Sequence, residues 1–239
     1  MCTILFSFTP VSGERLVLLA NRDEFYNRPT APAGTWEDAP EVYAGRDLVA
    51  GGTWLGVTNS GRIAAVTNYR DPGQEPGELS RGALVADFLK GDADPLDYLS
   101  EIEKHADRYT GFNLIVGDIL GPASLFYFSN RGSGIKELGP GLYGLSNHLL
   151  DTPWPKVRRG KKVLRELLDR SAPEDDLFDL LADRTKAPDE ELPDTGVGIE
   201  IERQLSPIFI ETPVYGTRSS TVVRFSEKGE IRFDERVHV

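Results

Sequence analysis

The chain has 239 residues, a formal net charge of −11 at pH 7 and a pI of about 4.8, with 39% apolar and 27% charged residues. This composition is typical of a globular protein with its own core, and the acidity disfavours nucleic acid as a partner, because that affinity depends on Lys and Arg against phosphates. The sequence holds one cysteine, no run of 18 apolar residues and no signal-peptide pattern. We therefore expect no internal disulfide, no membrane span and a cytoplasmic location.

Arginine outnumbers lysine among the 27 basic residues. An acidic surface with few lysines fits a cytoplasm of high salt concentration, because carboxylates hold hydration and salt screens their mutual repulsion. A GC-rich genome, which favours arginine codons, explains the same bias without adaptation to salt. Both interpretations stay open.

The N-terminal part of the sequence predicts short strands joined by tight turns. Apolar runs at residues 3–10 and 14–21 flank "VSG", a pattern typical of a hairpin. Residues 25–53 are rich in glycine and proline and are expected to form loops. Residues 54–69 then predict two more strands around the turn "NSG".

The middle of the chain predicts two helices followed by further strands. Residues 79–91 repeat apolar side chains at helical spacing, and residues 95–109 form a second helical pattern. Strands are expected at residues 111–119, 123–130 and 141–148.

The C-terminal part returns to helices and then to strands. Residues 155–182 look helical, residues 185–206 form a polar surface excursion, and residues 215–239 predict two or three strands around "EKGE". Strands joined by short turns favour antiparallel pairing over doubly wound units. We therefore predict an α+β fold in which helices cover two mainly antiparallel sheets, in one domain over residues 1–239.

The only cysteine, Cys2, directly follows the initiator methionine. Methionine aminopeptidases remove Met1 when the next residue is small, which would leave a free α-amino group on Cys2. That amine titrates at about 8 and a thiol at about 8.5, so the neutral amine can accept the thiol proton. One residue would then supply both nucleophile and base. An incidental small residue at position 2 would look the same, and position alone does not separate the two interpretations.

Four polar residues, Asn21 to Glu24, follow the apolar "LVLL" abruptly. In an extended strand Asn21 and Asp23 point one way, and Arg22 and Glu24 the other. If the first two strands pair through their turn, this polar end lies beside Cys2. There an Arg or Asp would orient the amine or lower the pKa of the thiol. A salt-bridged strand end is the structural alternative.

Other polar or aromatic residues mark further strand ends. Asn68 and Asn147 each end a predicted strand, where a side-chain amide either donates to a developing oxyanion or caps a turn. Trp54 follows the glycines of "GGTWLG", and Tyr69 follows Asn68, so both are candidates for a pocket wall. Arg218 stands beside three hydroxyls in "GTRSSTVV".

The sequence gives no sign of a metal or cofactor site. Its histidines stand apart, and no HExxH, CxxC or GxSxG motif occurs. We expect no metal and no cofactor, and a small-molecule substrate or ligand as the partner.

Several short motifs occur in a definite order: Met-Cys-Thr at the start, "NRDE" (21–24), "RP" (28–29), "GGTWLG" (51–56), "NYR" (68–70), "SRG" (80–82) and "YGTRSSTV" (215–222). Together they resemble the NRDE family, a transport and Golgi organisation protein family. That family is similar to N-terminal-nucleophile (Ntn) hydrolases of the bile-salt hydrolase and penicillin V acylase branch. The resemblance implies a four-layer αββα sandwich in which an N-terminal cysteine attacks an amide carbonyl.

The resemblance also implies site residues. Cys2 matches the nucleophile of the hydrolase branch. The branch has an Arg and an Asp three residues apart at the end of its second strand. Asn21 and Glu24 match that spacing, whereas Arg22 and Asp23 match the residue types. Both pairs stay candidates for the position that faces Cys2.

Three later positions complete the match. Asn68 in "TNY" corresponds to the oxyanion donor of the branch, Asn147 in "SN" to its second asparagine, and Arg218 to its late arginine. The expected catalytic residues are Cys2, Arg22, Asp23, Asn68, Asn147 and Arg218. The expected substrate-binding residues are Asn21, Glu24, Trp54 and Tyr69.

Two functions of different kinds follow. The first is a cysteine amidohydrolase that cleaves a non-peptide C–N bond through a thioester. The alternative, suggested by the resemblance, is a catalytically silent carrier of a hydrophobic small molecule such as haem, with a role in trafficking. In a haem carrier Cys2 would be an iron ligand or incidental, and His148 is the only histidine next to a motif. A structural interaction protein is a third option.

Overall fold

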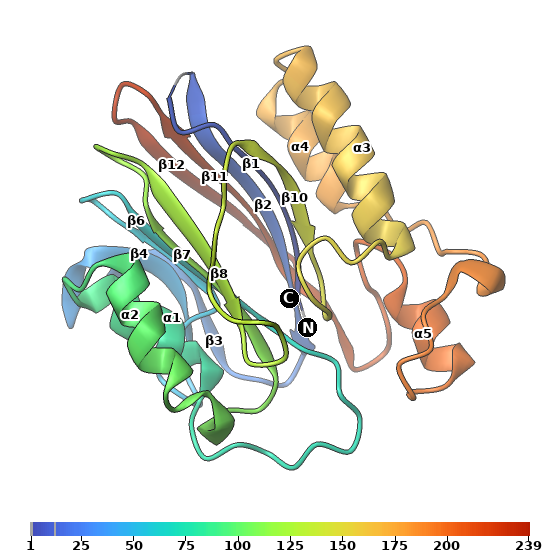
Figure 1. The fold of residues 1–239 in the computed structure, drawn as a ribbon. Helices are drawn as coiled ribbons and strands as arrows, with labels where there is room; N and C mark the ends of the chain where they lie inside the picture. The colour runs from blue at the N-terminus through green and yellow to red at the C-terminus, as the bar shows by residue number, and fades with distance from the viewer. Residues whose placement is uncertain (1, 12) are drawn as a thin grey trace.

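Two antiparallel sheets form the centre of the molecule, and the computed structural model describes residues 2–11 and 13–239 (Figure 1). The first sheet has five strands in the order β10-β1-β2-β11-β12, with bounds Gly141–Leu145, Cys2–Phe8, Glu14–Phe25, Tyr215–Ser226 and Ile231–Val237. The second has seven strands in chain order from β3 to β9, with bounds Thr30–Trp36, Ala39–Asp47, Leu55–Thr58, Arg62–Asn68, Phe112–Asp118, Ser124–Ser129 and Lys136–Glu137.

Helices cover the outer faces of both sheets (Figure 1). The α-helices are α1 (Arg81–Lys90), α2 (Pro95–Glu103), α3 (Pro155–Asp169), α4 (Glu174–Leu181) and α5 (Ile199–Leu205), and the 3₁₀ helices are η1 (Ala106–Arg108) and η2 (Asp189–Glu191). α1 and α2 pack on the second sheet, whereas α3 and α4 pack on the first.

Three buried clusters separate the four layers. One fills the space between α1, α2 and the second sheet around Phe88 and Phe112. A second lies between the two sheets around Phe6 and Ile115, and a third lies under α3 and α4 around Leu164. This order of helix, sheet, sheet and helix confirms the predicted αββα sandwich.

Strand β2 lies between β1 and β11 in the first sheet and is buried on both faces. For this reason its apolar segment, residues 16–20, runs without the alternation of a half-exposed strand. The polar residues Asn21 to Asp23 continue the same strand and are buried as well. The polar motif therefore sits inside the fold, at the end of the sheet where β1 begins.

The prediction of loops over residues 25–53 is wrong for most of that segment, which forms the hairpin β3–β4. β3 is the outer strand of its sheet, where a proline such as Pro32 removes no ladder hydrogen bond. Gly45 in β4 leaves space for an aromatic ring, because a Cβ there would lie 2.3 Å from Trp54. The proline of this segment is thus compatible with an edge strand, and Gly45 allows the close contact with the ring of Trp54.

The polar segment 185–206 is more structured than a surface excursion. It carries η2 and α5, and Glu202 of α5 is buried in an ion pair with Arg70 at 2.6 Å. Among the residues that the structure describes, no helix has both the length and the apolar character needed to cross a bilayer.

Candidate active site

Cys2 begins β1 and lies directly opposite Arg22 of β2 in the antiparallel register. Directly opposed side chains in such a pair share one face of the sheet, here the face that points toward the second sheet. Burial raises the pKa of the Cys2 thiol, whereas the charge of Arg22 and a hydrogen bond from the backbone N–H of Asp23 act to lower it. The resting thiol therefore needs a base to become a nucleophile.

Alternation along β2 divides the polar motif between two faces. Arg22 reaches across to the second sheet, where Nη1 donates to Thr30 Oγ1 at 3.1 Å. Asn21 points the other way and its Nδ2 donates to the carbonyls of Leu181 and Ile208 at 2.8 and 2.9 Å. Arg22, and not Asn21, therefore shares the face of Cys2.

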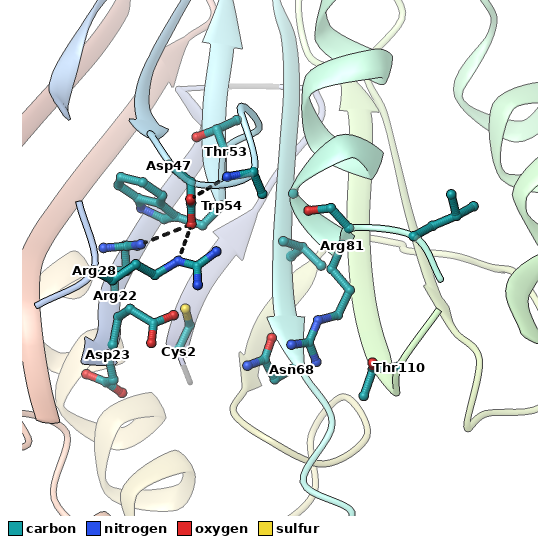
Figure 2. Close-up of a pocket in the computed structure, with 16 residues that line it drawn as sticks. Cys2, Arg22, Asp23, Arg28, Asp47, Thr53, Trp54, Asn68, Arg81 and Thr110 are labelled. Atoms are coloured by element: carbon teal, nitrogen blue, oxygen red, sulfur yellow. Dashed lines mark hydrogen bonds and ion pairs between the residues drawn. The ribbon is translucent and has the colours of Figure 1, made fainter. Parts of the chain in front are cut away.

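A cavity of about 220 Å³ opens between the ends of the two sheets (Figure 2). The residues that line it are Cys2, Arg22, Asp23, Glu24, Arg28, Asp47, Ala50, Thr53, Trp54, Val66, Asn68, Leu79, Ser80, Arg81, Gly82 and Thr110. In Figure 2, Asn68, Arg81 and Thr110 lie across the cavity from Cys2 and Arg22. Six of the ten residues expected at the site thus line one cavity, namely Cys2, Arg22, Asp23, Glu24, Trp54 and Asn68.

Arg22 is held rigidly by the second sheet. Its guanidinium stacks 4.1 Å from the ring centroid of Trp54 and lies 3.6 Å from a carboxylate oxygen of Asp47. Asp47 also accepts a hydrogen bond of 2.6 Å from Arg28 Nε. Burial alone would raise the pKa of Asp47, but this bond and backbone N–H donors hold it below its usual value. Asp47 is therefore a fixed anion that orients two arginines at the cavity wall (Figure 2).

Asp23 lies at the base of the site and is almost fully buried. Its Oδ1 accepts a hydrogen bond of 2.7 Å from Thr217 Oγ1. Burial raises the pKa of its carboxyl group, and the positive charge of Lys156 opposes that rise. Lys156 is itself buried, with its ammonium 3.0 Å from the carbonyl oxygen of Leu205. A buried carboxylate and a buried ammonium thus support each other behind Cys2.

The two candidate asparagines have different surroundings. Asn68 ends β6 and lines the cavity, and no hydrogen bond joins its side-chain amide to another described residue. Asn147 is fully buried, and its Nδ2 donates to the backbone oxygen of Asn68 at 3.0 Å. Asn147 thus lies behind the wall that Asn68 forms.

The remaining expected residues lie outside this cavity. Tyr69 packs against His148 with ring centroids 4.9 Å apart. Arg218 occupies an irregularity in the pairing of β11 with β2, where its guanidinium donates to the carbonyl of Arg28 and to Thr30. Arg218 and Arg22 line a smaller cavity of about 50 Å³ behind the first. The structure thus places Arg218 in a second cavity that it shares with Arg22 and that Cys2 does not line.

Sequence reasoning missed Arg28, Asp47, Ser80 and Arg81 as cavity residues. Arg28 and Arg81 lie in the motifs "RP" and "SRG", whose order along the chain was noted without a role for either arginine. No sequence pattern marks Asp47 as a site residue, because its contacts depend on how the β3–β4 hairpin meets β2. Within the described residues, no group of three or more His, Cys, Asp or Glu side chains is arranged to hold a metal ion.

The sequence matches a known family over nearly its whole length. The family model for Transport and Golgi organisation 2 matches residues 1–238. A mouse protein, the Transport and Golgi organization 2 homolog, is 38% identical over an alignment of 255 positions. That alignment covers 99% of this chain and 92% of the mouse protein.

Solved structures show where the fold recurs. The Caenorhabditis elegans ortholog of N-acylethanolamine-hydrolyzing acid amidase aligns with a TM-score of 0.53 at 13% identity, covering 92% of each chain. A mutant conjugated bile acid hydrolase from Clostridium perfringens aligns with a TM-score of 0.51 at 9% identity, covering 100% of this chain and 97% of the other. These likenesses confirm the expected Ntn-hydrolase fold, and at such identities they show the fold alone.

Proposed function

The chain belongs to the Transport and Golgi organisation 2 family, and we propose that it is an N-terminal cysteine amidohydrolase. It would cleave a non-peptide C–N amide bond through a thioester. The observation that carries the proposal is the position of Cys2 at a cavity with Arg22 opposite it in register and the Asn68 amide across from it. The names of the two structural neighbours, an amidase and a bile acid hydrolase, agree with this reaction class.

The proposed reaction begins with removal of Met1, which frees the α-amino group of Cys2. The neutral amine takes the thiol proton, and the sulfur attacks the carbonyl carbon. The carbonyl oxygen becomes an oxyanion that accepts a hydrogen bond from Asn68. As the C–N bond breaks, the ammonium returns the proton to the leaving amine, and a thioester remains. Water, deprotonated by the same amine, then attacks the thioester and releases a carboxylic acid.

Asp23 has a supporting part in this proposal. Its carboxylate lies close enough to Cys2 for its charge to raise the pKa of the thiol. The same proximity suits an anion that holds a newly formed α-ammonium in place. Lys156 favours the ionised form of Asp23, because its positive charge lowers the pKa of that carboxyl group.

The alternative hypothesis, a carrier of a hydrophobic ligand such as haem, has less support in the cavity. Six of its 16 lining residues are charged: Arg22, Asp23, Glu24, Arg28, Asp47 and Arg81. Pockets for apolar ligands are lined mainly by apolar and aromatic side chains. A haem titration of the wild type and Cys2→Ala tests the carrier: a Soret change that depends on Cys2 would favour it over the hydrolase.

The hydrolase is tested with a panel of N-acyl aminocoumarins that differ in acyl length and charge. We expect the wild type to release the fluorescent amine from at least one class, and an acid quench to trap an acyl group on Cys2. Cys2→Ala should release none, because it lacks the attacking sulfur. Equal release by the wild type and Cys2→Ala would contradict the proposal. A cytoplasmic location stays part of the proposal, and fractionation of the native cells tests it.

A further inference from the structure

The wall across from Cys2 holds two side chains that can donate hydrogen bonds to a charged oxygen. One is the Asn68 amide and the other is the Arg81 guanidinium, which Figure 2 shows on the same side of the cavity. Asn147 is excluded from this wall, because it is fully buried and donates to the backbone of Asn68. The second asparagine implied by the family resemblance is therefore not available to a substrate in this arrangement.

Arg81 differs from the other arginines of the cavity in lacking a carboxylate partner. Arg22 and Arg28 both pair with Asp47. Among the described residues, no carboxylate lies within ion-pairing distance of Arg81, and its one hydrogen bond runs from Nη1 to the backbone oxygen of Gly111 at 3.1 Å. The remaining N–H donors of this guanidinium are left for an occupant of the cavity.

Arg81 is nevertheless largely removed from water, and this burial lowers its pKa. The charges of Glu24 and of ionised Cys2 act on Arg81 from the same cavity, without a direct ion pair. A cation that is mostly removed from water and has no directly paired anion is costly, so such a group is typical of a site where negative charge arrives from outside. The first residue of α1 is Arg81 itself, and Ser80 and Gly82 also line the cavity. The positive end of the helix dipole therefore acts on the same space.

We propose that Arg81 is the second oxyanion donor of this site, beside Asn68, and that Asn147 only positions Asn68. The assignment rests on the proposed nucleophile, Cys2. When the sulfur attacks, the π electrons of the carbonyl move onto oxygen, and this oxyanion accepts hydrogen bonds from Asn68 and Arg81. When the C=O bond re-forms, the bond to the leaving group breaks with its electron pair, and both donors return to their resting state.

A charged donor has a consequence that a neutral amide lacks. The full positive charge of Arg81 favours the tetrahedral intermediate over the neutral carbonyl substrate, because the charge it meets exists only after attack. Loss of Arg81 should therefore slow acyl transfer to Cys2 while leaving reactions of Cys2 that form no oxyanion almost unchanged.

The test compares two reactions of the single cysteine. p-Nitrophenyl acetate acylates Cys2 through an oxyanion: the sulfur displaces nitrophenolate, and the thiol proton passes to the α-amine. Iodoacetamide alkylates the same sulfur by displacement of iodide, without an oxyanion. The ratio of the two rate constants, measured by intact mass and nitrophenolate release at matched pH, isolates oxyanion stabilisation from thiol ionisation.

We expect Arg81→Gln to lower this ratio about 10²-fold, the usual loss for one oxyanion donor, and Arg81→Lys to lower it less, because the charge stays. Arg108→Gln is the matched control, since Arg108 is exposed, pairs with Glu78 and lies outside the cavity. Thermal unfolding of each variant checks that the fold persists.

Each other outcome has a definite meaning. An unchanged ratio in Arg81→Gln would overturn the assignment of Arg81, and so would an equal fall in acylation and alkylation, which would make Arg81 a support for the thiol or the fold. A wild type that p-nitrophenyl acetate does not acylate at Cys2 would instead overturn the proposed nucleophile, and the role of Arg81 with it.

Discussion

Cys2 and Arg22 are direct partners across the β1–β2 pair, so the one thiol of the chain and a buried guanidinium share a face of the sheet. If either strand shifted by one residue in the pairing, the side chain of Cys2 or of Arg22 would move to the opposite face of the sheet. Arg22 is in turn fixed by Asp47 and Trp54 of the second sheet. The position of the proposed nucleophile, Cys2, thus depends on the contact between the two sheets.

The first prediction concerns the ionisation of Cys2. Arg22→Gln removes a charge that lowers the pKa of the thiol, so that pKa should rise further and alkylation at pH 7 should slow about tenfold. Arg22→Lys keeps the charge and should stay closer to the wild type. Alkylation by iodoacetamide across pH measures this, and the variants should converge at high pH. A pH profile that is unchanged in Arg22→Gln would contradict the role of Arg22.

The second prediction separates the two asparagines. Asn68→Ala should lower the acylation-to-alkylation ratio about 10²-fold with little change in the free energy of unfolding, because its amide faces the cavity. Asn147→Ala should cost about 1–3 kcal/mol of stability, because it leaves the half-buried carbonyl of Asn68 without its donor. Denaturant titration and the two Cys2 reactions measure both effects. A larger catalytic loss in Asn147→Ala than in Asn68→Ala would reverse the assignment.

The third prediction tests the close contact that positions the start of α1. A Cβ on Gly52 would lie 2.4 Å from the backbone carbon and oxygen of Gly82, which cannot move without the helix. Gly52→Ala should therefore cost about 1–3 kcal/mol and displace Arg81 from the cavity wall, lowering the acylation ratio. Gly34→Ala is the matched control, because no atom lies within 4 Å of its Cβ position. Equal behaviour of the two variants would show that the contact is not required.

The fourth prediction uses the buried ammonium of Lys156. Burial lowers its pKa to about 8, whereas an unfolded lysine titrates at about 10.4. Between these values the unfolded chain binds the proton and the folded one does not. Lys156 therefore makes the free energy of unfolding rise with pH in this window, by up to about 1.4 kcal/mol per pH unit.

Lys156→Met should lack that rise between about pH 8 and 10. The matched control is Lys162→Met, an exposed lysine on the same helix, which should keep the rise. Urea unfolding of the wild type and both variants at several pH values measures the difference. Identical slopes in all three proteins would show that Lys156 does not titrate in this range.

Local pattern was enough to predict most of the strands and the helices that pack on them. Leu84, Val85, Phe88 and Leu89 form the buried side of α1, as their helical spacing predicts. The hairpin β3–β4 was missed because glycine and proline indicate loops locally, while its pairing comes from neighbours elsewhere in the sheet. The αββα arrangement itself came from the family resemblance, since spacing alone does not decide how sheets stack.

The candidate site was predictable only in part, for a physical reason. The proximity of Cys2 to the "NRDE" strand end could be predicted, because both lie on one hairpin. The sequence left open whether Arg22 or Asn21 faces Cys2, and the strand register places Arg22 there. Arg81 could not be singled out, since its surroundings are set in three dimensions, where no carboxylate of the described residues forms an ion pair with it.

The central claim, that Cys2 is an N-terminal nucleophile, is tested most directly by the intact mass of the purified protein before and after brief exposure to p-nitrophenyl acetate. The account predicts a starting mass without Met1, a gain of one acetyl group that peptide mapping locates at residue 2, and no gain in Cys2→Ala. A chain that retains Met1, or that gains the acetyl group equally in Cys2→Ala, would contradict it.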